Sequence, residues 1–504
     1  MQQIPQIWFN LTSSHNWNRP PVGIIRVEQS IYKEIGQLFG SERIIPCIWR
    51  DGAFRRVDND SNETPPPGSI LITMGLDWDQ PYKETLFDLR KKHSVTVIAC
   101  CYDLIPVLFP QYCVGEVAAY FKEYFAAVNW GASGVLCISR NSEKDYLELC
   151  RDSGWPSIPT CVMPLGDNLP ADKGEVTTEV RQLRSQPIIL FVSTIERRKN
   201  HQCLVQAYHL LRRTRPDLKL PKLVFVGMPG WGVGDLLKDI ELDPLLKDHI
   251  VLLHHVSDAE LLALYKVAML CVYPSFYEGW GLPLGEALAM GKPVFSSDAG
   301  SLPEVGGDLI RYLSPFNPSA WAEAIREALE NPAILEQQAS RVAAGYRSRE
   351  WKDTAEVVLN FAKECHALDS AGRFPLVLNP GYDCSTGSSK HIGPFLSVAP
   401  PSVGYILYGP FVSIPEGRYY ITVDGSTEDT ADGEVMFDVC AGDKESPVIL
   451  AYGDAALCST TSSLLWRSEI FSSETPLSNL QVRCSLKAPR NITIHKVAIH
   501  SESS

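Results

Sequence analysis

The stretch Val272–Gly291, VYPSFYEGWGLPLGEALAMG, joins the end of a strand, a glycine-rich loop and the start of a helix. The apolar run 269–273 has the length and composition of a buried strand, and a proline and a serine end it. Gly279 and Gly281 let the backbone approach a ligand closely, and Pro283 suits the first turn of the following helix. The stretch therefore predicts a strand, a ligand-facing loop and a short helix.

Two glutamates in this stretch, Glu278 and Glu286, are separated by seven residues. The N–H groups of Gly281 and Leu282 lie where the loop becomes a helix, and together with the helix dipole they favour a phosphate. A carboxylate accepts hydrogen bonds from sugar hydroxyls but repels phosphate, so glutamates on both sides fit a ligand with phosphates in its middle and hydroxyls at its ends. A nucleotide sugar has this arrangement. An isolated glutamate pair would instead suit a solvated helix end.

At these residues the sequence resembles the retaining glycosyltransferases of family four, whose Glu-x7-Glu motif is matched by Glu278 and Glu286. The likeness covers roughly the middle third of the chain and includes the segments 256–258, 261–265, 293–297, 300–301 and 303–305. The resemblance implies the GT-B fold, that Glu278 contacts the donor sugar and Glu286 the ribose, and that the backbone at Val256 contacts the base. The loop from Gly279 to Leu282 would hold the donor.

Length and composition set limits on the fold and on the partners. A chain of 504 residues predicts about three domains. The formal charge of -13 argues against a nucleic-acid partner, since phosphate backbones need a basic face. No leader and no apolar stretch of ~18 residues is present, which predicts a soluble cytoplasmic protein. Contact with the inner membrane face or with an assembly protein stays open. The 14 scattered cysteines predict buried thiols rather than disulfides or a metal site.

Strand-like and helix-like segments alternate through two regions, and the pattern predicts two Rossmann-like lobes of the α/β class. We expect a first, acceptor-binding lobe at 1–170, a linker at 171–186, a donor-nucleotide lobe at 187–345 and a helix at 346–372 that crosses back to the first lobe. The strand candidates are 7–11, 44–49, 70–74, 95–101, 135–139 and 160–164 in the first lobe, and 188–193, 223–227, 249–256, 269–273, 293–297 and 309–313 in the second.

Two loops of the first lobe are candidate ligand-binding segments, because ligands of such sheets bind beyond the carboxyl ends of the strands. Gly23 falls where the family has an N-terminal glycine loop on the acceptor side, although Pro-Pro-x-Gly is also an ordinary turn. Arg26 follows and suits either the phosphates or the surface. In the second loop, many relatives have His-Asp-Leu where this chain has Tyr102 and Asp103, so proton handling by a histidine is in doubt here.

Arg198 and Lys199 follow the strand 188–193, and Asn200 suits the N-cap of the helix 202–213. Two cations at a helix N-terminus predict an anion site, although a basic turn in solvent has the same composition. The family resemblance implies that this pair holds the donor diphosphate. Relatives often have a further arginine near the position of Ser193. Because this chain lacks it, Lys199 would supply a larger share of the positive charge at the site. No metal or other cofactor is expected if these cations neutralise the phosphates.

Beyond residue 373 the pattern changes to short alternating segments with Gly, Pro and Ser between them, which predicts an all-β sandwich or jelly roll at 373–504. The strand candidates are 405–407, 418–423, 435–440, 448–451, 480–485 and 492–499, with turn and edge around 409–411 and 415–420. The aromatic residues there suit either a core or a sugar platform. Carbohydrate binding, docking to another protein and structural support are all open roles.

The resemblance is greatest to bacterial mannosyl- and rhamnosyltransferases of surface polysaccharide synthesis, such as that of the lipopolysaccharide O-antigen. It implies a retaining transferase that moves mannose or rhamnose from a GDP-sugar to a glycan or lipid-linked acceptor. The proposed catalytic residues are Glu278, Lys199, Arg198 and Asp103. A binding protein that has lost catalysis is an alternative, supported by Tyr102 and Ser193. A two-lobe epimerase or phosphorylase is a third, but no GxGxxG, P-loop or pyridoxal-lysine signature is present.

Overall fold

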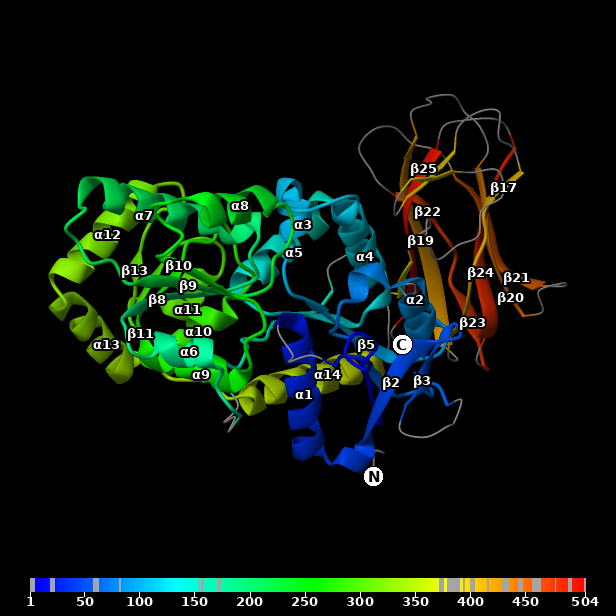
Figure 1. Ribbon diagram of the computed structural model, residues 1–504. Coiled ribbons are helices and arrows are strands. Elements are labelled where there is room, and N and C mark those ends of the chain that lie inside the picture. The colour runs from blue at the N-terminus through cyan, green and yellow to red at the C-terminus, as the bar shows by residue number, and fades with distance from the viewer. Residues whose placement is uncertain are drawn as a thin grey trace.

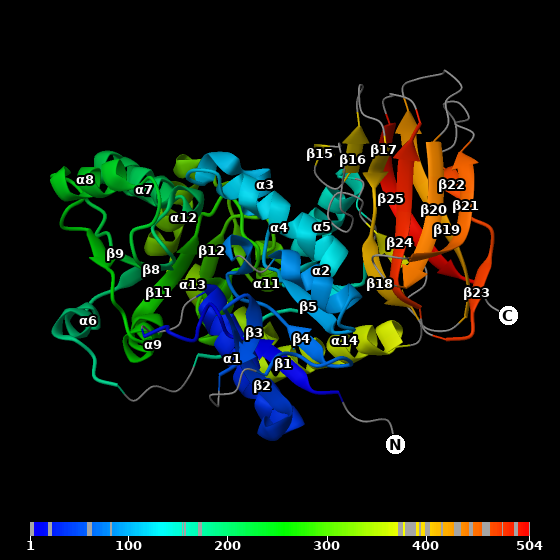
Figure 2. The same cartoon turned by 90° about the vertical axis from the view of Figure 1, so that its right-hand side faces the viewer.

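The computed structural model describes residues 5–18, 23–57, 63–80, 83–153, 155, 158–169, 174–370, 376–378, 390–392, 395–398, 404–414, 417–427, 435–442, 447–455, 464–475, 477–487 and 492–502. Two α/β lobes lie side by side, and a β-sandwich stands against the first lobe (Figures 1 and 2). Among the described residues, no helix is long and apolar enough to cross a membrane.

The first lobe is built on a sheet with the order β3-β2-β1-β4-β5-β6-β7 in the described residues. Its strands are β1 Ile7–Asn10, β2 Ile44–Arg50, β3 Ala53–Arg56, β4 Ile70–Ile72, β5 Thr96–Cys101, β6 Gly134–Cys137 and β7 Thr160–Val162. All six predicted strands are present. The prediction missed β3, which pairs antiparallel with β2, so this sheet is mixed. The hairpin turn is Asp51-Gly52, where both residues have positive φ.

Helices cover both faces of this first sheet because its strands are buried runs of apolar residues. These helices are α1 Gly23–Phe39, α2 Lys83–Lys91, α3 Ile105–Leu108, α4 Val117–Gly131 and α5 Arg140–Asp152. Short 3₁₀ turns are η1 Ser41–Arg43, η2 Asp77–Asp79 and η3 Pro110–Tyr112.

The second lobe has the strand order β10-β9-β8-β11-β12-β13, and its described strand pairs are parallel. Its strands are β8 Ile188–Val192, β9 Lys222–Val226, β10 Ile250–Leu253, β11 Ala268–Tyr273, β12 Val294–Ser296 and β13 Arg311–Tyr312. Its helical elements are η4 Arg197–Lys199, α7 His201–Thr214, α8 Gly234–Leu242, α9 Asp258–Val267, α10 Leu282–Ala289, α11 Leu302–Gly306, α12 Pro318–Glu330 and α13 Ala333–Gly345. These strands match the predicted positions to within a few residues.

The two lobes are linked twice. The predicted linker 171–186 is more than a polar connection, because it contains α6 Thr178–Leu183, whose Val180 and Leu183 are buried in the large core cluster. The second link is α14 Trp351–Ser370, which packs on α1 and on the first sheet, as expected. Trp351 lies against Gly166 so closely that a Cβ on this glycine would come 2.7 Å from the indole.

The C-terminal region forms two antiparallel sheets packed face to face. One contains β14 Leu376–Leu378, β15 Lys390–Ile392, β16 Phe395–Val398, β19 Gly417–Thr427, β22 Leu464–Arg467, β23 Phe471–Ser473 and β25 Ile492–Ser501. The other contains β17 Gly404–Leu407, β18 Pro410–Ile414, β20 Val435–Gly442, β21 Pro447–Ala455 and β24 Leu477–Leu486. The predicted turn 409–411 is wrong, since Pro410 begins β18 and pairs with β24. Residues 415–416 lie outside the described residues.

Candidate functional site

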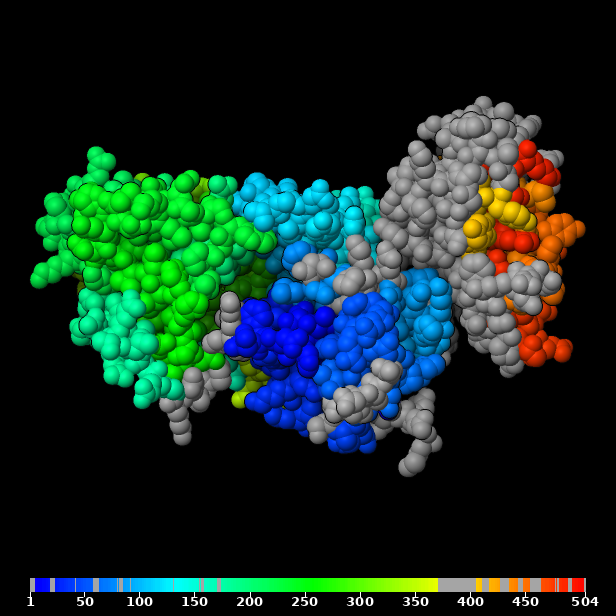
Figure 3. Space-filling view, turned by 45° about the vertical axis from the view of Figure 1, so that its right-hand side comes forward, coloured from blue at the N-terminus to red at the C-terminus, as the bar shows by residue number. Residues whose placement is uncertain are grey.

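Loops from both lobes meet at the carboxyl ends of their parallel strands, where open α/β sheets place ligands. In the second lobe, η4 follows β8 and the segment 274–281 follows β11. In the first lobe, residues 102–104 follow β5 and α1 follows β1 after an intervening loop. The space-filling view shows a hollow where the second lobe, in green, meets the blue and cyan first lobe (Figure 3).

Glu278, Lys199 and Arg198 form one buried ionic cluster. Lys199 Nζ donates to both carboxylate oxygens of Glu278, at 2.7 and 2.8 Å, and Arg198 Nη1 donates to Oε2 at 2.8 Å. Arg198 also donates to the Tyr277 carbonyl at 2.6 Å and, through Nη2, to Glu196 at 2.7 Å. Only 8% of the Glu278 surface is exposed. The expected proximity of positions 199 and 278 is therefore present.

The opposite charges of this cluster shift the pKa values of Glu278 and Arg198. Burial by itself raises the pKa of Glu278, but Lys199 and Arg198 outweigh burial and hold this pKa at about 2. Burial opposes the charge on Arg198, yet Glu278 and Glu196 raise its pKa above the ordinary value. Glu278 is therefore held as a carboxylate beside two basic side chains in a site of low solvent exposure.

Asn200 fixes the backbone that carries the two cations. It has φ 61° and ψ 42°, in the left-handed region where asparagine is tolerated better than most residues. It occupies the N-cap position of α7, as predicted, but makes no side-chain cap. Its amide instead donates to the carbonyls of Pro274 and Pro315, at 3.0 and 2.8 Å. Asn200 thus ties η4 to the loop that bears Glu278.

Glu286 is joined to the other lobe by Arg26. Arg26 donates from Nη1 to Glu286 at 2.9 Å and from Nη2 to Asp258 at 2.5 Å, which bridges α1 to α10 and α9. The Tyr265 hydroxyl donates to the second oxygen of Glu286 at 2.9 Å. Burial raises the pKa of Glu286, and the charge of Arg26 opposes that rise. Arg26 therefore lies in the cleft between the lobes, and of its two predicted places the surface one is wrong.

Tyr102 and Asp103 lie directly against the glycine loop. A Cβ on Gly279 would stand 2.5 Å from the Tyr102 carbonyl oxygen and 2.9 Å from Asp103 Cβ, so a larger residue at 279 would push the lobes apart. Burial raises the pKa of Asp103, whose Oδ1 accepts from the Ile105 N–H at 3.0 Å. The Tyr102 hydroxyl donates to the Met74 carbonyl at 2.6 Å. That bond keeps this hydroxyl within the first lobe.

The other predicted contact residues lie at the ends of elements or in loops. Gly281 has φ 113° and begins α10 at Leu282, so the loop-to-helix transition falls where it was expected. Val256 lies beyond the end of β10, in a loop and not in the strand that was predicted to reach it. Gly23 is exposed with φ 52°, while the Arg19–Val22 part of its loop lies outside the described residues. The described residues hold no cluster of three metal-ligand side chains.

Several residues that join the lobes at this site were not predicted. Ser142 Oγ donates to the Tyr102 carbonyl at 2.9 Å and also lies 3.3 Å from the Gly279 carbonyl. The carboxylate of Glu304 accepts from the backbone N–H groups of Arg140 and Asn141, at 2.9 and 2.8 Å, across the lobe boundary. Asp258 belongs to a segment that carries the family resemblance, but its pairing with Arg26 across 232 positions leaves no local pattern in the sequence.

The second lobe and the two-lobed fold both have counterparts among known proteins. Residues 176–351 match the family model described as glycosyl transferases group 1. The chain is similar to the O-antigen chain mannosyltransferase B of Escherichia coli, with 29% identity over 274 residues, or 54% of this chain and 68% of that protein. It is 25% identical over 291 residues to the serotype-specific mannosyltransferase WbdA of Escherichia coli, covering 55% of this chain and 35% of that protein.

A solved structure with the same fold is that of Anabaena HepE in complex with UDP and glucose. It has a TM-score of 0.51 and 17% identity, and it covers 71% of this chain and 100% of that one. This likeness is one of fold, and it extends over both α/β lobes. Residues 176–351 thus match the group 1 glycosyltransferases, which supports a glycosyltransferase activity, and the two α/β lobes have the GT-B fold.

Proposed function

We propose that this protein is a retaining family-four type transferase that moves a mannose- or rhamnose-type sugar from a nucleoside-diphosphate donor, a GDP-sugar in the first instance, to a glycan or lipid-linked glycan. The observation that carries the proposal is the buried cluster in which Lys199 and Arg198 both contact Glu278. This arrangement places two cations beside a carboxylate at the start of the donor lobe. It supports binding of a diphosphate and a hydroxylated sugar next to each other.

The chemistry needs loss of the nucleoside diphosphate, so negative charge develops on the leaving phosphate. Lys199, Arg198 and the N-terminus of α10 near Leu282 are proposed to stabilise that charge. Glu278 is proposed to hold the sugar and to offset positive charge at the anomeric carbon. Because these groups carry the electrostatics, we propose that no metal is required. The acceptor's proton passes to the leaving phosphate oxygen on the same face, which retains the anomeric configuration.

The ribose and base are proposed to lie beside Glu286 and Val256. Since Arg26 already contacts Glu286 from the first lobe, donor binding and lobe closure are proposed to share that carboxylate. Asp103 and Gly279, which lie together at the boundary, are proposed to border the sugar. Gly23 and Arg26 are proposed to line the acceptor side.

The identity of the sugar is proposed from two facts. The E. coli relatives are mannosyltransferases by name. In this chain the side chain at position 102 is a tyrosine whose hydroxyl donates to Met74, so it offers less to a sugar hydroxyl. This favours a donor without its 6-hydroxyl, such as rhamnose. Turnover of GDP-mannose with none of GDP-rhamnose would contradict the 6-deoxy preference while leaving the transferase proposal intact.

The test is nucleotide release from a panel of GDP- and UDP-sugars, with and without glycan acceptors. Glu278→Ala and Lys199→Ala are each expected to reduce kcat by about 10²- to 10³-fold, because each removes an electrostatic group at the reacting centre. Arg213→Gln, at an exposed position on α7, is the matched control and should keep wild-type turnover. Near-wild-type turnover in both site variants would refute the assignment. Donor binding without turnover by the wild-type protein would favour the binding-protein alternative.

A further inference from the structure

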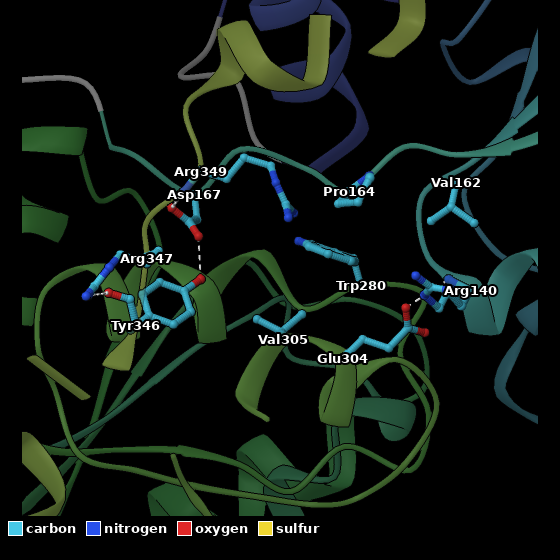
Figure 4. A pocket seen from close by; sticks show the side chains of 10 residues that line it. All are labelled: Arg140, Val162, Pro164, Asp167, Trp280, Glu304, Val305, Tyr346, Arg347 and Arg349. Atoms are coloured by element: carbon cyan, nitrogen blue, oxygen red, sulfur yellow. Dashed lines mark hydrogen bonds between the residues drawn. The ribbon is translucent and has the colours of Figure 1, made fainter. Parts of the chain in front are cut away.

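A cavity lies at the junction of the two lobes and the segment that leads into α14 (Figure 4). Its volume is about 500 Å³, which is within the range of small-molecule sites. The first lobe contributes Arg140 and Val162, and the segment after β7 contributes Pro164 and Asp167. The second lobe contributes Trp280, Glu304 and Val305. The segment before α14 contributes Tyr346, Arg347 and Arg349.

The acidic side chains of this cavity are already occupied by donors from the protein itself. Asp167 accepts from the Ser348 hydroxyl at 2.5 Å, from the Arg349 N–H at 3.0 Å and from the Tyr346 hydroxyl. Glu304 accepts from two backbone N–H groups of α5. These bonds are structural links between the lobes. The carboxylates are therefore engaged, and they do not neutralise the arginine side chains by direct contact.

The hydrogen-bond donors of the cavity differ from these engaged carboxylates. Within the described part of the chain, the guanidinium groups of Arg140 and Arg349 make no hydrogen bond or ion pair. Trp280 is 9% exposed, and its indole Nε1 is buried without a hydrogen-bond partner. Figure 4 shows this nitrogen and the Arg349 guanidinium directed toward one another inside the cavity. Two donors that face each other suit an acceptor placed between them.

We propose that this cavity binds a small phosphorylated molecule, with the phosphate between Trp280 Nε1 and Arg349. Both protein groups can only donate, so the ligand must accept from both. A phosphate offers three acceptor oxygens and carries the charge that guanidinium groups bind in a two-pronged manner. Arg140 stands at the opposite end of the cavity and supplies further positive potential (Figure 4). Three arginines face two carboxylates, so the lining has a net positive charge.

This site is separate from the donor cluster, because it uses neither Lys199, Arg198 nor Glu278. Its walls come from both lobes and from the segment that joins them, so a bound phosphate favours the arrangement in which those walls stand together. The site therefore suits a ligand that acts on lobe closure rather than one that is consumed.

Calorimetric titration of the full-length protein with glucose 6-phosphate tests the proposal, with glucose and glucuronate as neutral and carboxylate probes. We expect glucose 6-phosphate to bind, glucuronate to bind more weakly and glucose not to bind. Arg349→Gln should weaken glucose 6-phosphate binding about tenfold, since a charged hydrogen bond is lost. Trp280→Phe, which retains an aromatic ring but removes the donor, should weaken it about fivefold.

The controls separate this cavity from the donor site. Arg213→Gln removes an exposed arginine remote from the cavity lining and should bind like the wild-type protein, and Lys199→Ala should also bind normally. Loss of binding in Lys199→Ala but not in Arg349→Gln would show that the probe occupies the donor site and would overturn the proposal. Absence of glucose 6-phosphate binding, or tighter binding of glucuronate, would overturn it as well. Each of these results leaves the proposed transferase activity untouched.

Discussion

At the scale of single residues, whether a buried carboxyl group is charged depends on the cations that contact it. Glu278 keeps its charge because two cations contact it, whereas Glu28 on α1 is buried without such cations. Burial raises the pKa of Glu28 to about 8, and nearby Asp77 adds to the rise. A carboxyl group with so high a pKa is protonated in the folded protein at neutral pH and charged in the unfolded chain.

Glu28 therefore predicts a particular dependence of stability on pH. The folded state holds a proton that the unfolded state releases above its ordinary pKa of 4.5, so this contribution is complete below pH 4.5 and is lost as the pH rises through about 8. Glu28→Gln has no proton to lose. The unfolding temperature of the wild-type protein should thus fall relative to that of Glu28→Gln between pH 5 and pH 8. Parallel curves of unfolding temperature against pH for the two proteins would contradict the raised pKa of Glu28.

The sequence marked candidate site residues, but it did not predict most of their contacts. Glu278, Lys199 and Arg198 could be found because a local motif marks each of them. The pairing of Arg26 with Glu286 and Asp258 could not, since it depends on how two lobes are placed and not on any spacing. The hydrogen bond of the Tyr102 hydroxyl could not be predicted either. Its role depends on the Met74 carbonyl, which follows a different strand.

At the scale of elements, the alternation of apolar runs located the parallel strands because each is buried on both faces. The same pattern did not reveal the short elements. The strand β3 has few residues, but the Asp51-Gly52 turn that precedes it is a recognised hairpin signal and could have been used. The helix α6 was hidden in a polar segment because two buried residues, Val180 and Leu183, are too few to make a clear period.

The crossing helix α14 approaches the first sheet very closely at Gly134 of β6. A Cβ there would come 2.6 Å from both Cys365 Sγ and Phe361 Cζ. Gly134→Ala should therefore move α14 away from the sheet and reduce the free energy of unfolding by about 1–3 kcal/mol. Gly36→Ala on α1 is the matched control, because its Cβ would meet nothing within 4 Å and it should stabilise the helix by about 0.5–1 kcal/mol. Urea denaturation measures both, and equal effects would argue against close packing at β6.

At the scale of the whole molecule, the β-sandwich has its own apolar core, which residues such as Ile421, Phe437 and Val482 form. The exact role of its aromatic residues was open in the sequence. Tyr419 is buried and belongs to the core, whereas Tyr405 is 48% exposed and Tyr420 stacks on His500 with centroids 4.6 Å apart. No predicted site residue of the transferase lies in this part of the chain.

Phe87 of α2 connects the first lobe to the sandwich, since it is buried in the same apolar cluster as the sandwich core. Phe87→Asp should loosen this attachment because it would bury an unpaired charge. We expect small-angle scattering to show a larger radius of gyration, while nucleotide release by the lobes stays within about twofold of the wild-type rate. An unchanged radius would show that other contacts hold the sandwich in place. A large loss of turnover would mean that the sandwich takes part in the reaction.

Calorimetric binding of GDP and UDP tests most directly the claim that the cations after β8 hold the donor diphosphate. The account predicts that at least one of these nucleotides binds the wild-type protein and binds Lys199→Ala about tenfold or more weakly, because the phosphates lose a charged donor. Arg349→Gln, which leaves that cluster intact, should retain the wild-type affinity. Undiminished affinity in Lys199→Ala would contradict the account.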